Sequence, residues 1–260
     1  MTDEYELLSS TRYDEQLLNV DWNTSVNNGT PSPFLLLPYH VDRLRDAAHQ
    51  HGWSDAPLSL ASLSKVCEEA ITRLAGKGPF RKQLPLKVRI LLKRDGSLSA
   101  TATPCVPFPF PDLLAPSSDA EHIRTIVVDT QPTPPSIFTS TKTTRRDIYD
   151  VARARLDLPP FTTPAGSRCD VLIWNTKGEL METSIRNIAF RRNDRWMTPP
   201  IQSGCLPGVM RRVLIERGMW VEAADGELMK DDIVDGEVVM TANSVEAGRL
   251  GRIQLKPGQM

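Results

Sequence analysis

The chain has 260 residues, which is enough for one large domain or two small ones with a substantial core. Its formal net charge of -1 gives no electrostatic reason to expect binding to nucleic acid or to anionic lipid. The acidic start MTDEYELLSS lacks the apolar core of a secretory signal, and apolar runs such as FLLLPY and VRILL are too short to span a bilayer. We therefore expect a cytoplasmic protein that binds neither nucleic acid nor membranes.

The first segment, to about residue 104, mixes strands and helices. Strand-like stretches occur in YELLSSTRYD, and a helix is expected to open after Pro38 and to end near Gly52. The clearest helix lies in LSLASLSKVCEEAITRLAGKG, where apolar residues recur at helical spacing up to Gly76. The next stretch, LKVRILLKRDGSLSATATP, predicts a hairpin that turns at Asp95 and Gly96.

A proline-rich stretch, PCVPFPFPDLLAPSSDAEH, then interrupts the pattern and predicts an extended connector. After it, the sequence predicts a strand in IRTIVVDT, a basic helix in the segment around TKTTRRDIYDVARARL, and three strands between 169 and 200. LPGVMRRVLIERG predicts a helix, and strand, short helix and strand follow. We therefore expect an α/β protein with a small N-terminal domain at 1–105, a linker at 106–122 and a larger C-terminal domain at 123–260.

The sequence lacks the motifs of several common sites. It has no GxGxxG after a strand, no GxxxxGK[ST] and no GxSxG. We expect no metal, because neither the cysteines nor the histidines show ligand spacing. We interpret the cysteines as reduced thiols, most of them in the core: Cys67, Cys105, Cys169 and Cys205.

Four short signals remain, and each has an ordinary alternative. Lys142 is either a reactive amine or a surface charge, and Arg43 is either a phosphate ligand or a surface arginine. Glu182 is either a buried carboxylate that needs a partner or a surface residue of an edge strand. The turn in SGCLPGVMRR either offers N–H groups to an anion or only caps a helix. Together the four signals meet the requirements of pyridoxal phosphate, which needs an amine, a carboxylate and a phosphate site.

Five motifs then carry a family resemblance: YHVDRLRDAA, TKTTRRDIYDVARARL, GELMETSIRNIAF, TPPIQSGCLPGVMRR and VVMTANSVEAG. In order and approximate spacing they resemble the class IV aminotransferase family, the fold-type-IV pyridoxal phosphate enzymes. The N-terminal part is most similar to the fungal-type aminodeoxychorismate lyases. The resemblance covers most of the chain and implies a two-domain α/β (α+β) fold like that of D-amino-acid aminotransferase. In that fold the C-terminal domain is a pseudo-barrel that carries the lysine, and the protein is a homodimer.

The resemblance also implies roles for individual residues. Lys142 matches the lysine that forms a Schiff base with pyridoxal 5'-phosphate and moves the substrate proton, and Glu182 matches the carboxylate that pairs with the pyridine nitrogen. The phosphate ligands would be Arg43, the backbone N–H groups of Val209 and Met210, and Asn243. Asn187 matches a structural asparagine. The sequence departs from branched-chain aminotransferases at Asp147, where those enzymes have a tyrosine.

The activity implied by the resemblance is the conversion of 4-amino-4-deoxychorismate to 4-aminobenzoate and pyruvate in folate biosynthesis. A transaminase acting on a D-amino acid or an R-configured primary amine is the alternative, and a non-enzymatic relic of the fold is a third. The substrate of the lyase carries two carboxylates, which calls for cationic partners, and a hydroxyl would help the leaving group. Candidates for these substrate contacts are Arg12, Arg145, Arg146 and Arg186, with Ser10 or Thr11 as the hydroxyl.

Overall fold

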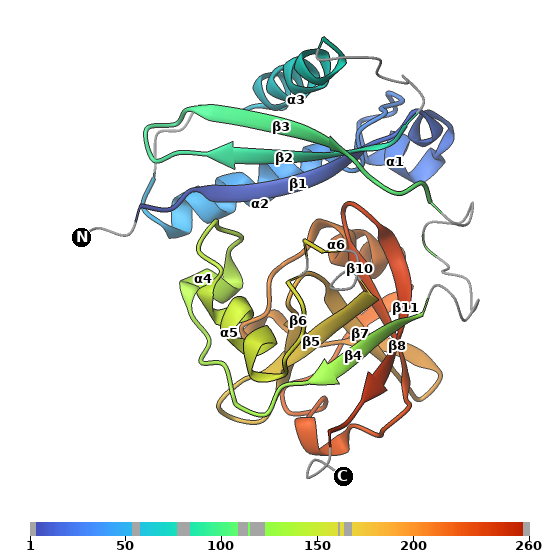
Figure 1. The fold of residues 1–260 in the computed structure, drawn as a ribbon. Coiled ribbons are helices and arrows are strands. Elements are labelled where there is room, and N and C mark those ends of the chain that lie inside the picture. Colours follow the sequence, from blue (N-terminus) through green and yellow to red (C-terminus); the bar gives the residue numbers. More distant parts are fainter. Residues whose placement is uncertain are drawn as a thin grey trace. The chain divides into compact units, whose positions relative to one another are not determined.

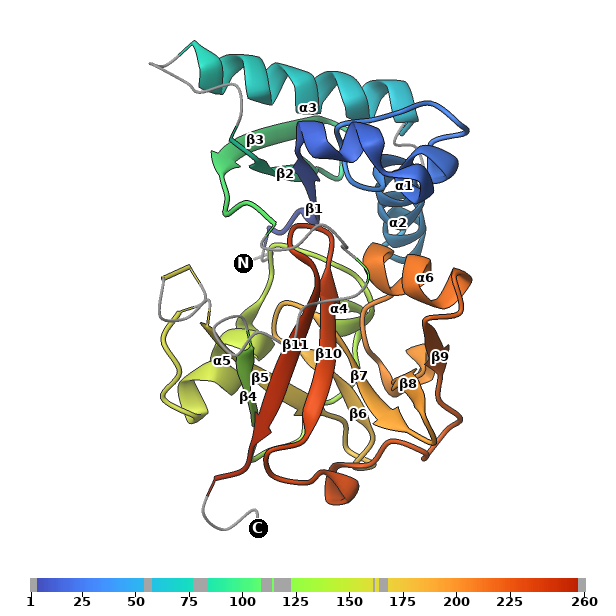
Figure 2. The same ribbon diagram turned by 90° about the vertical axis from the view of Figure 1, so that its right-hand side faces the viewer.

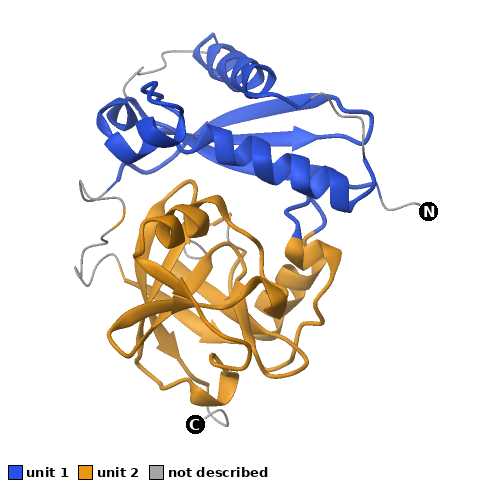
Figure 3. Ribbon diagram, turned by 180° about the vertical axis from the view of Figure 1, so that it is seen from behind, with its two compact units in different colours: residues 1–109, 141–145 blue, residues 110–140, 146–260 orange. Residues whose placement is uncertain are grey.

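The computed structural model describes residues 4–53, 58–76, 84–108, 114, 123–160, 162–163 and 168–256. They form a mixed α/β structure, as expected (Figures 1 and 2). The chain divides into two compact units, residues 1–109 with 141–145 and residues 110–140 with 146–260, which Figure 3 colours separately. Most of the expected linker at 106–122 lies outside the described residues, so the expected domain boundaries stay a prediction.

The first unit is built on a three-stranded antiparallel sheet in the order β1-β2-β3. Its strands are β1 (Leu7–Tyr13), β2 (Leu86–Leu92) and β3 (Leu98–Pro104). Along β2, buried and more exposed residues alternate, so one face of this strand belongs to the core. The predicted hairpin is confirmed: β2 and β3 pair along their whole length, and Gly96 has a positive φ of 83° in the turn.

Two long helices cover this sheet, namely α2 (Leu37–Gln50) and α3 (Leu60–Ala75). Helix α3 begins with a capping box, in which Ser59 Oγ accepts from the backbone N–H of Ser62 and Ser62 Oγ accepts from that of Ser59, both at 3.0 Å. The helix ends at Gly76, as the sequence predicted. The unit also contains a 3-10 turn, η1 (Glu15–Asn19), and the short helix α1 (Asp21–Val26).

The second unit is built on an eight-stranded sheet in the order β6-β5-β4-β11-β10-β7-β8-β9. Strand β4 runs parallel to both of its neighbours, β8 runs parallel to β9, and the other pairs are antiparallel. The sheet curls, and β6 also contacts β7. The bounds are β4 (Arg124–Val128), β5 (Cys169–Trp174), β6 (Leu180–Thr183), β7 (Asn187–Arg192), β8 (Arg195–Thr198), β9 (Trp220–Glu222), β10 (Val238–Asn243) and β11 (Ala247–Gln254).

Residues 169–200 form four strands, so the prediction of three strands there is wrong. The second predicted strand is divided into β6 and β7 by a turn at residues 184–186. At this bend the backbone N–H of Ser184 donates to the buried carboxylate of Asp170 on β5 at 3.1 Å, and the backbone N–H of Thr183 donates to the carbonyl of Arg186 at 2.9 Å.

Neighbouring residues of β4 and β5 pack into two clusters on opposite faces of the sheet. Ile126, Val128 and Leu172 belong to one cluster. Val127 and Val171 belong to the other, which is covered by α5 (Asp147–Arg155). The remaining helical elements are α4 (Ile137–Ser140), η4 (Ile201–Ser203), α6 (Val209–Glu216) and η5 (Lys230–Asp232).

Two further findings concern expectations from the sequence. Cys67 and Cys205 are buried, as expected, whereas Cys105 and Cys169 are only half-buried, and all four cysteines are free. Among the described residues, no helix has both the length and the apolar character required to cross a membrane.

Candidate active site

The segment that carries Lys142 is anchored to the edge strand of the first unit. The backbone N–H of Leu8 donates to the carbonyl of Lys142 at 2.8 Å, and Leu7 forms an isolated bridge with Thr143. The flanking hydroxyls are also engaged, since Thr141 Oγ1 bonds His51 Nε2 at 2.8 Å. The threonines around the lysine therefore fix its backbone on both sides, and its side chain is half-buried.

Arg43 lies in the same unit, on α2, and is also half-buried. Its Nη2 donates to Ser9 Oγ on β1 at 2.7 Å, and Ser9 Oγ in turn bonds Nδ1 of His40 at 2.7 Å. Strand β1 therefore contacts Lys142 and Arg43, because Leu8 binds the backbone of Lys142 and Ser9 binds the side chain of Arg43.

The three substrate-binding candidates on β1 differ in their surroundings. Ser10 is half-buried, whereas Thr11 is fully buried and its Oγ1 donates to the carbonyl of Leu35 at 2.8 Å. Arg12 is 1% exposed, and its Nε donates to Asp14 at 2.9 Å. The guanidinium of Arg12 also lies over the ring of Phe108. The assignment of these residues to the substrate stays a prediction.

Glu182 lies on β6 in the second unit and is 4% exposed. This burial excludes the alternative of a surface residue on an edge strand. Its Oε1 accepts from the hydroxyl of Tyr149 at 2.7 Å, and its Oε2 accepts from Nδ2 of Asn187 at 3.3 Å. Burial and the nearby Glu182 raise the pKa of Tyr149 well above its ordinary value, so Tyr149 remains a donor. The carboxylate is therefore held from both oxygens.

The LPG turn before α6 is locked to the same asparagine. Nδ2 of Asn187 donates to the carbonyl of Leu206 at 2.8 Å, and Oδ1 of Asn187 lies 1.9 Å from the place where a Cβ of Gly208 would stand. Only glycine fits there. Val209 and Met210 follow with buried side chains, and their backbone N–H groups belong to the first turn of α6, which lacks carbonyl acceptors within the helix.

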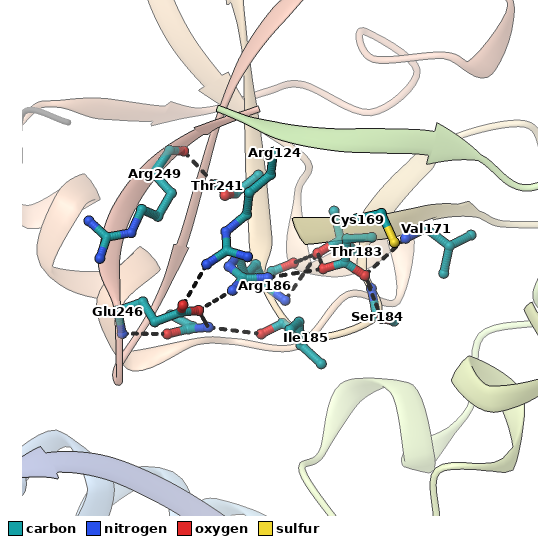
Figure 4. Close-up of polar contacts among 12 residues, drawn as sticks. Arg124, Cys169, Val171, Thr183, Ser184, Ile185, Arg186, Thr241, Glu246 and Arg249 are labelled. Carbon is teal, nitrogen blue, oxygen red and sulfur yellow. Dashed lines mark hydrogen bonds and ion pairs between the residues drawn. The ribbon is translucent and has the colours of Figure 1, made fainter. Parts of the chain in front are cut away.

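Asn243 lies at the end of β10, and its side chain organises the turn into β11. Its Oδ1 accepts from the backbone N–H groups of Val245 and Glu246 at 3.0 and 2.8 Å. Figure 4 shows Arg124 and Arg186 both directed at the carboxylate of Glu246. Burial by itself would raise the pKa of Glu246, but the two arginines together lower it to about 2. The role of Asn243 at a phosphate stays a prediction.

Besides Glu182, a second carboxylate of this unit is buried, that of Asp170. Through Arg186 it connects the turn between β10 and β11 to the loop after Glu182. Arg186 is 3% exposed, and its Nη1 donates to Asp170 at 3.3 Å. Its Nη2 bonds Glu246 (Figure 4). Asp170 is 0% exposed and also accepts from Thr183 Oγ1 at 2.7 Å and from Arg153 Nη1 at 3.4 Å. The hydrogen bonds of Asp170 therefore fix the backbone that follows β6.

The two remaining arginine candidates lie at the start of α5. Arg145 is exposed, and its carbonyl accepts from Thr143 Oγ1 at 3.1 Å. Arg146 is half-buried, donates from Nη2 to the carbonyl of Ser184 and lies over the ring of Tyr149 at 4.6 Å. Arg145 is thus the exposed member of the arginine set.

Residues of these arrangements that were not predicted from the sequence include Tyr149, Asp170 and Glu246. Tyr149 could have been noticed, because it shares a helical face with Ala152 and Leu156, both of which are buried. Asp170 is the only charged residue of the apolar stretch CDVLIW, and a charge in such a strand needs partners. Nothing in the sequence near Glu246 indicates its ion pairs.

Comparison with known proteins gives a consistent picture. The family described as amino-transferase class IV matches residues 24–249. An aminodeoxychorismate lyase of Saccharomyces cerevisiae is 29% identical over 86% of this chain and 68% of its own length. A Schizosaccharomyces pombe protein to which the same activity is provisionally assigned is 36% identical over 51% of this chain, and the match spans only 56% of that protein.

Solved structures share the fold. The branched-chain amino acid aminotransferase of Escherichia coli superimposes with a TM-score of 0.65 over 98% of this chain and 77% of its own, at 14% identity. The expected fold class is confirmed, and so is the resemblance stated from the motifs. The chain belongs to the class IV aminotransferase family of enzymes.

Proposed function

We propose that this protein is a pyridoxal phosphate-dependent lyase that converts 4-amino-4-deoxychorismate to 4-aminobenzoate and pyruvate. The observation that carries the proposal is the similarity to the S. cerevisiae aminodeoxychorismate lyase along 86% of this chain. The motifs around Lys142, Glu182 and the LPG turn support it, since they lie within the matched family region. The exposed Asp147, in place of a tyrosine, counts against branched-chain transamination.

The donor and acceptor groups of the two units suit this cofactor. Glu182 is a buried carboxylate held by two donors, which is the group required beside a pyridine nitrogen that must stay protonated. Lys142 supplies an amine on a fixed backbone, and Arg43 supplies a guanidinium on the same unit. The first turn of α6, with Val209 and Met210, would supply N–H groups to the phosphate, and the proposal keeps Asn243 in that set.

When bound, pyridoxal phosphate supplies an electron sink for the substrate carbanion. Lys142 takes the proton from the ring carbon that carries the amine, and Glu182 stabilises the positive charge at the pyridine nitrogen. Tyr149 and Asn187 keep the Glu182 carboxylate in one orientation, which would keep its negative charge directed at the pyridine nitrogen. Loss of the enolpyruvyl group makes the substrate ring aromatic, so the protein mainly needs to orient the substrate and move one proton.

The substrate carboxylates need cationic partners, and the arginine set can be ordered by burial. Arg145 is placed first because its side chain is exposed and therefore accessible to a ligand. Arg12 and Arg186 are placed last, because they are 1% and 3% exposed and already bind carboxylates of this chain. Arg146 lies between these extremes, and Ser10, which is half-buried, is placed before Thr11 as the hydroxyl.

The proposal includes a homodimer, on the basis of the family resemblance. Light scattering coupled to gel filtration would measure it. A mass near twice the 29.0 kDa of the chain is expected, and a mass of one chain at micromolar concentration would contradict it.

The test of the function is an assay of the purified protein with aminodeoxychorismate, in which 4-aminobenzoate and pyruvate are measured together. Lys142→Ala should abolish both products, whereas Lys177→Ala, at an exposed turn residue, should leave them unchanged. A transaminase would instead give no pyruvate from aminodeoxychorismate and would bleach the cofactor absorbance on addition of D-alanine or an R-amine. That pair of results would contradict the lyase proposal and favour the alternative.

A further inference from the structure

Three polar side chains meet between β1 and α2 in the first unit. Ser9 on β1 and His40 on α2 are both 0% exposed, and Arg43 lies one helical turn after His40. Ser9 Oγ lies 2.7 Å from Nδ1 of His40 and 2.7 Å from Nη2 of Arg43. Residues three apart on a helix share a face, so α2 presents both side chains to the same serine.

The hydrogens of this cluster can be assigned from chemistry alone. A guanidinium only donates hydrogen bonds, so Ser9 Oγ must accept from Arg43. The proton of the Ser9 hydroxyl is then available to His40, and we assign its Nδ1, which also lies 3.5 Å from Nη2 of Arg43, as the acceptor. His40 is therefore neutral, with its proton on Nε2.

The surroundings of His40 favour the same state. Burial and the neighbouring charges of Arg43 and Lys142 lower the pKa of His40 well below its ordinary value, against a smaller opposing effect of a backbone hydrogen bond with Leu35. A protonated imidazole would stand beside two cations, and it would take away the acceptor that Ser9 needs. The hydrogen bonds therefore run in one direction, from Arg43 to Ser9 to His40.

We propose that Ser9 and His40 are positioning residues that fix the direction of the Arg43 guanidinium for the phosphate of the bound cofactor. The inference rests on the proposed function, which places Arg43 at that phosphate. An arginine side chain has many rotamers, and its planar fork binds an anion well only when it is oriented. The hydroxyl of Ser9 removes part of that freedom before the ligand binds, and the neutral His40 keeps the hydroxyl turned toward itself.

The experiment compares two ligands that differ only in the phosphate. Dissociation constants for pyridoxal 5'-phosphate and for pyridoxal are measured by absorbance titration of the full-length apoprotein. For Ser9→Ala we expect the constant for pyridoxal phosphate to rise about tenfold, as loss of one hydrogen bond to a charged group predicts, with pyridoxal binding unchanged. Ser9→Thr, which keeps the hydroxyl, should bind pyridoxal phosphate almost as tightly as the wild type does.

A double-mutant cycle tests whether Ser9 acts through the arginine. In an Arg43→Ala background, Ser9→Ala should have little further effect on either ligand. The matched control is Ser32→Ala, which removes another buried serine hydroxyl of this unit, one that accepts from the backbone of Phe34. Ser32→Ala should leave unchanged the ratio of the dissociation constants for pyridoxal phosphate and pyridoxal. Thermal unfolding of each variant shows whether that variant is folded.

The outcomes separate the inference from the function on which it rests. Equal weakening of both ligands by Ser9→Ala, or full additivity with Arg43→Ala, would mean that Ser9 only supports the fold, and the inference would be overturned. A wild-type protein that binds pyridoxal phosphate no more tightly than pyridoxal would remove the phosphate role of Arg43 itself, and with it this inference. Absence of 4-aminobenzoate formation with normal phosphate selectivity would instead contradict the lyase activity alone.

Discussion

Replacement of Asp170 by asparagine should destabilise the second unit strongly. The side chain is 0% exposed and accepts hydrogen bonds on both oxygens, including one from Thr183 Oγ1 at 2.7 Å and one from the backbone N–H of Val171 at 2.9 Å. An asparagine of the same shape would direct an NH2 group at donors, whichever way it is turned. It would also remove the charge that faces Arg153 and Arg186.

The size of the effect follows from these contacts. Removing one partner of a buried ion pair costs about 3–5 kcal/mol, because the remaining charge is left without compensation. The lower end applies here, since Arg186 keeps its pair with Glu246 and Arg153 keeps hydrogen bonds to backbone carbonyls such as that of Cys169. About 3 kcal/mol corresponds to a fall in Tm of about 6–12 °C for a unit of this size.

Tryptophan fluorescence during thermal unfolding is a suitable assay, because three of the five tryptophans (Trp174, Trp196 and Trp220) belong to the second unit. The matched control is Asp194→Asn, at an exposed carboxylate 3.4 Å from Arg191, where a loss below about 1 kcal/mol is expected. A Tm for Asp170→Asn within about 2 °C of the wild type would refute the view that this carboxylate holds the loop.

Three other changes give distinct readouts. Gly208→Ala would place a Cβ 1.9 Å from Oδ1 of Asn187, so the side chain of Asn187 must move and its Nδ2 must release Glu182. Cofactor affinity in a titration should then fall at least about tenfold, and wild-type affinity would refute the view that Asn187 locks this turn. Tyr149→Phe removes the hydroxyl that donates to Glu182 at 2.7 Å, and urea unfolding should show a loss of about 1.5–3 kcal/mol in the free energy of unfolding. A loss below about 0.5 kcal/mol would contradict this prediction. The pKa of Glu246 in the folded protein, about 2, lies below its value of about 4.3 in the unfolded chain. Its contribution to stability is therefore complete above about pH 4.3 and is lost as the pH falls toward 2. The difference in unfolding free energy between wild type and Glu246→Gln should shrink over this pH range, and a constant difference would contradict the prediction.

Local features of the fold were predictable from the sequence because their causes are local. Helix α3 follows from its apolar spacing and from Gly76, and the hairpin of β2 and β3 follows from the turn at Asp95 and Gly96. The burial of Glu182 was one of two alternatives from the sequence, and the structure selects it. In each case the signal lies within a few residues of the structure that it predicts.

The features that were missed depend on partners far along the chain. At the bend that divides β6 from β7, the backbone of Ser184 is bound by Asp170, which lies more than ten residues earlier. Tyr149 reaches Glu182 from another element, and Arg124 reaches Glu246 across more than 100 residues. No local pattern encodes such pairs, so the sequence led to a proposal for the groups that carry the chemistry but not for the residues that bind those groups.

The order of strands in the second sheet has a consequence for how the protein is made. Strand β11 comes last in sequence among the strands of that sheet, yet it lies between β4 and β10, and its Gly251 pairs with Arg124. During synthesis β4 and β10 therefore present unpaired edges until β11 has left the ribosome, and unpaired edges promote aggregation. Such long-range pairing also slows refolding, so the yield of active protein should depend on temperature and on chaperones more than its moderate size suggests.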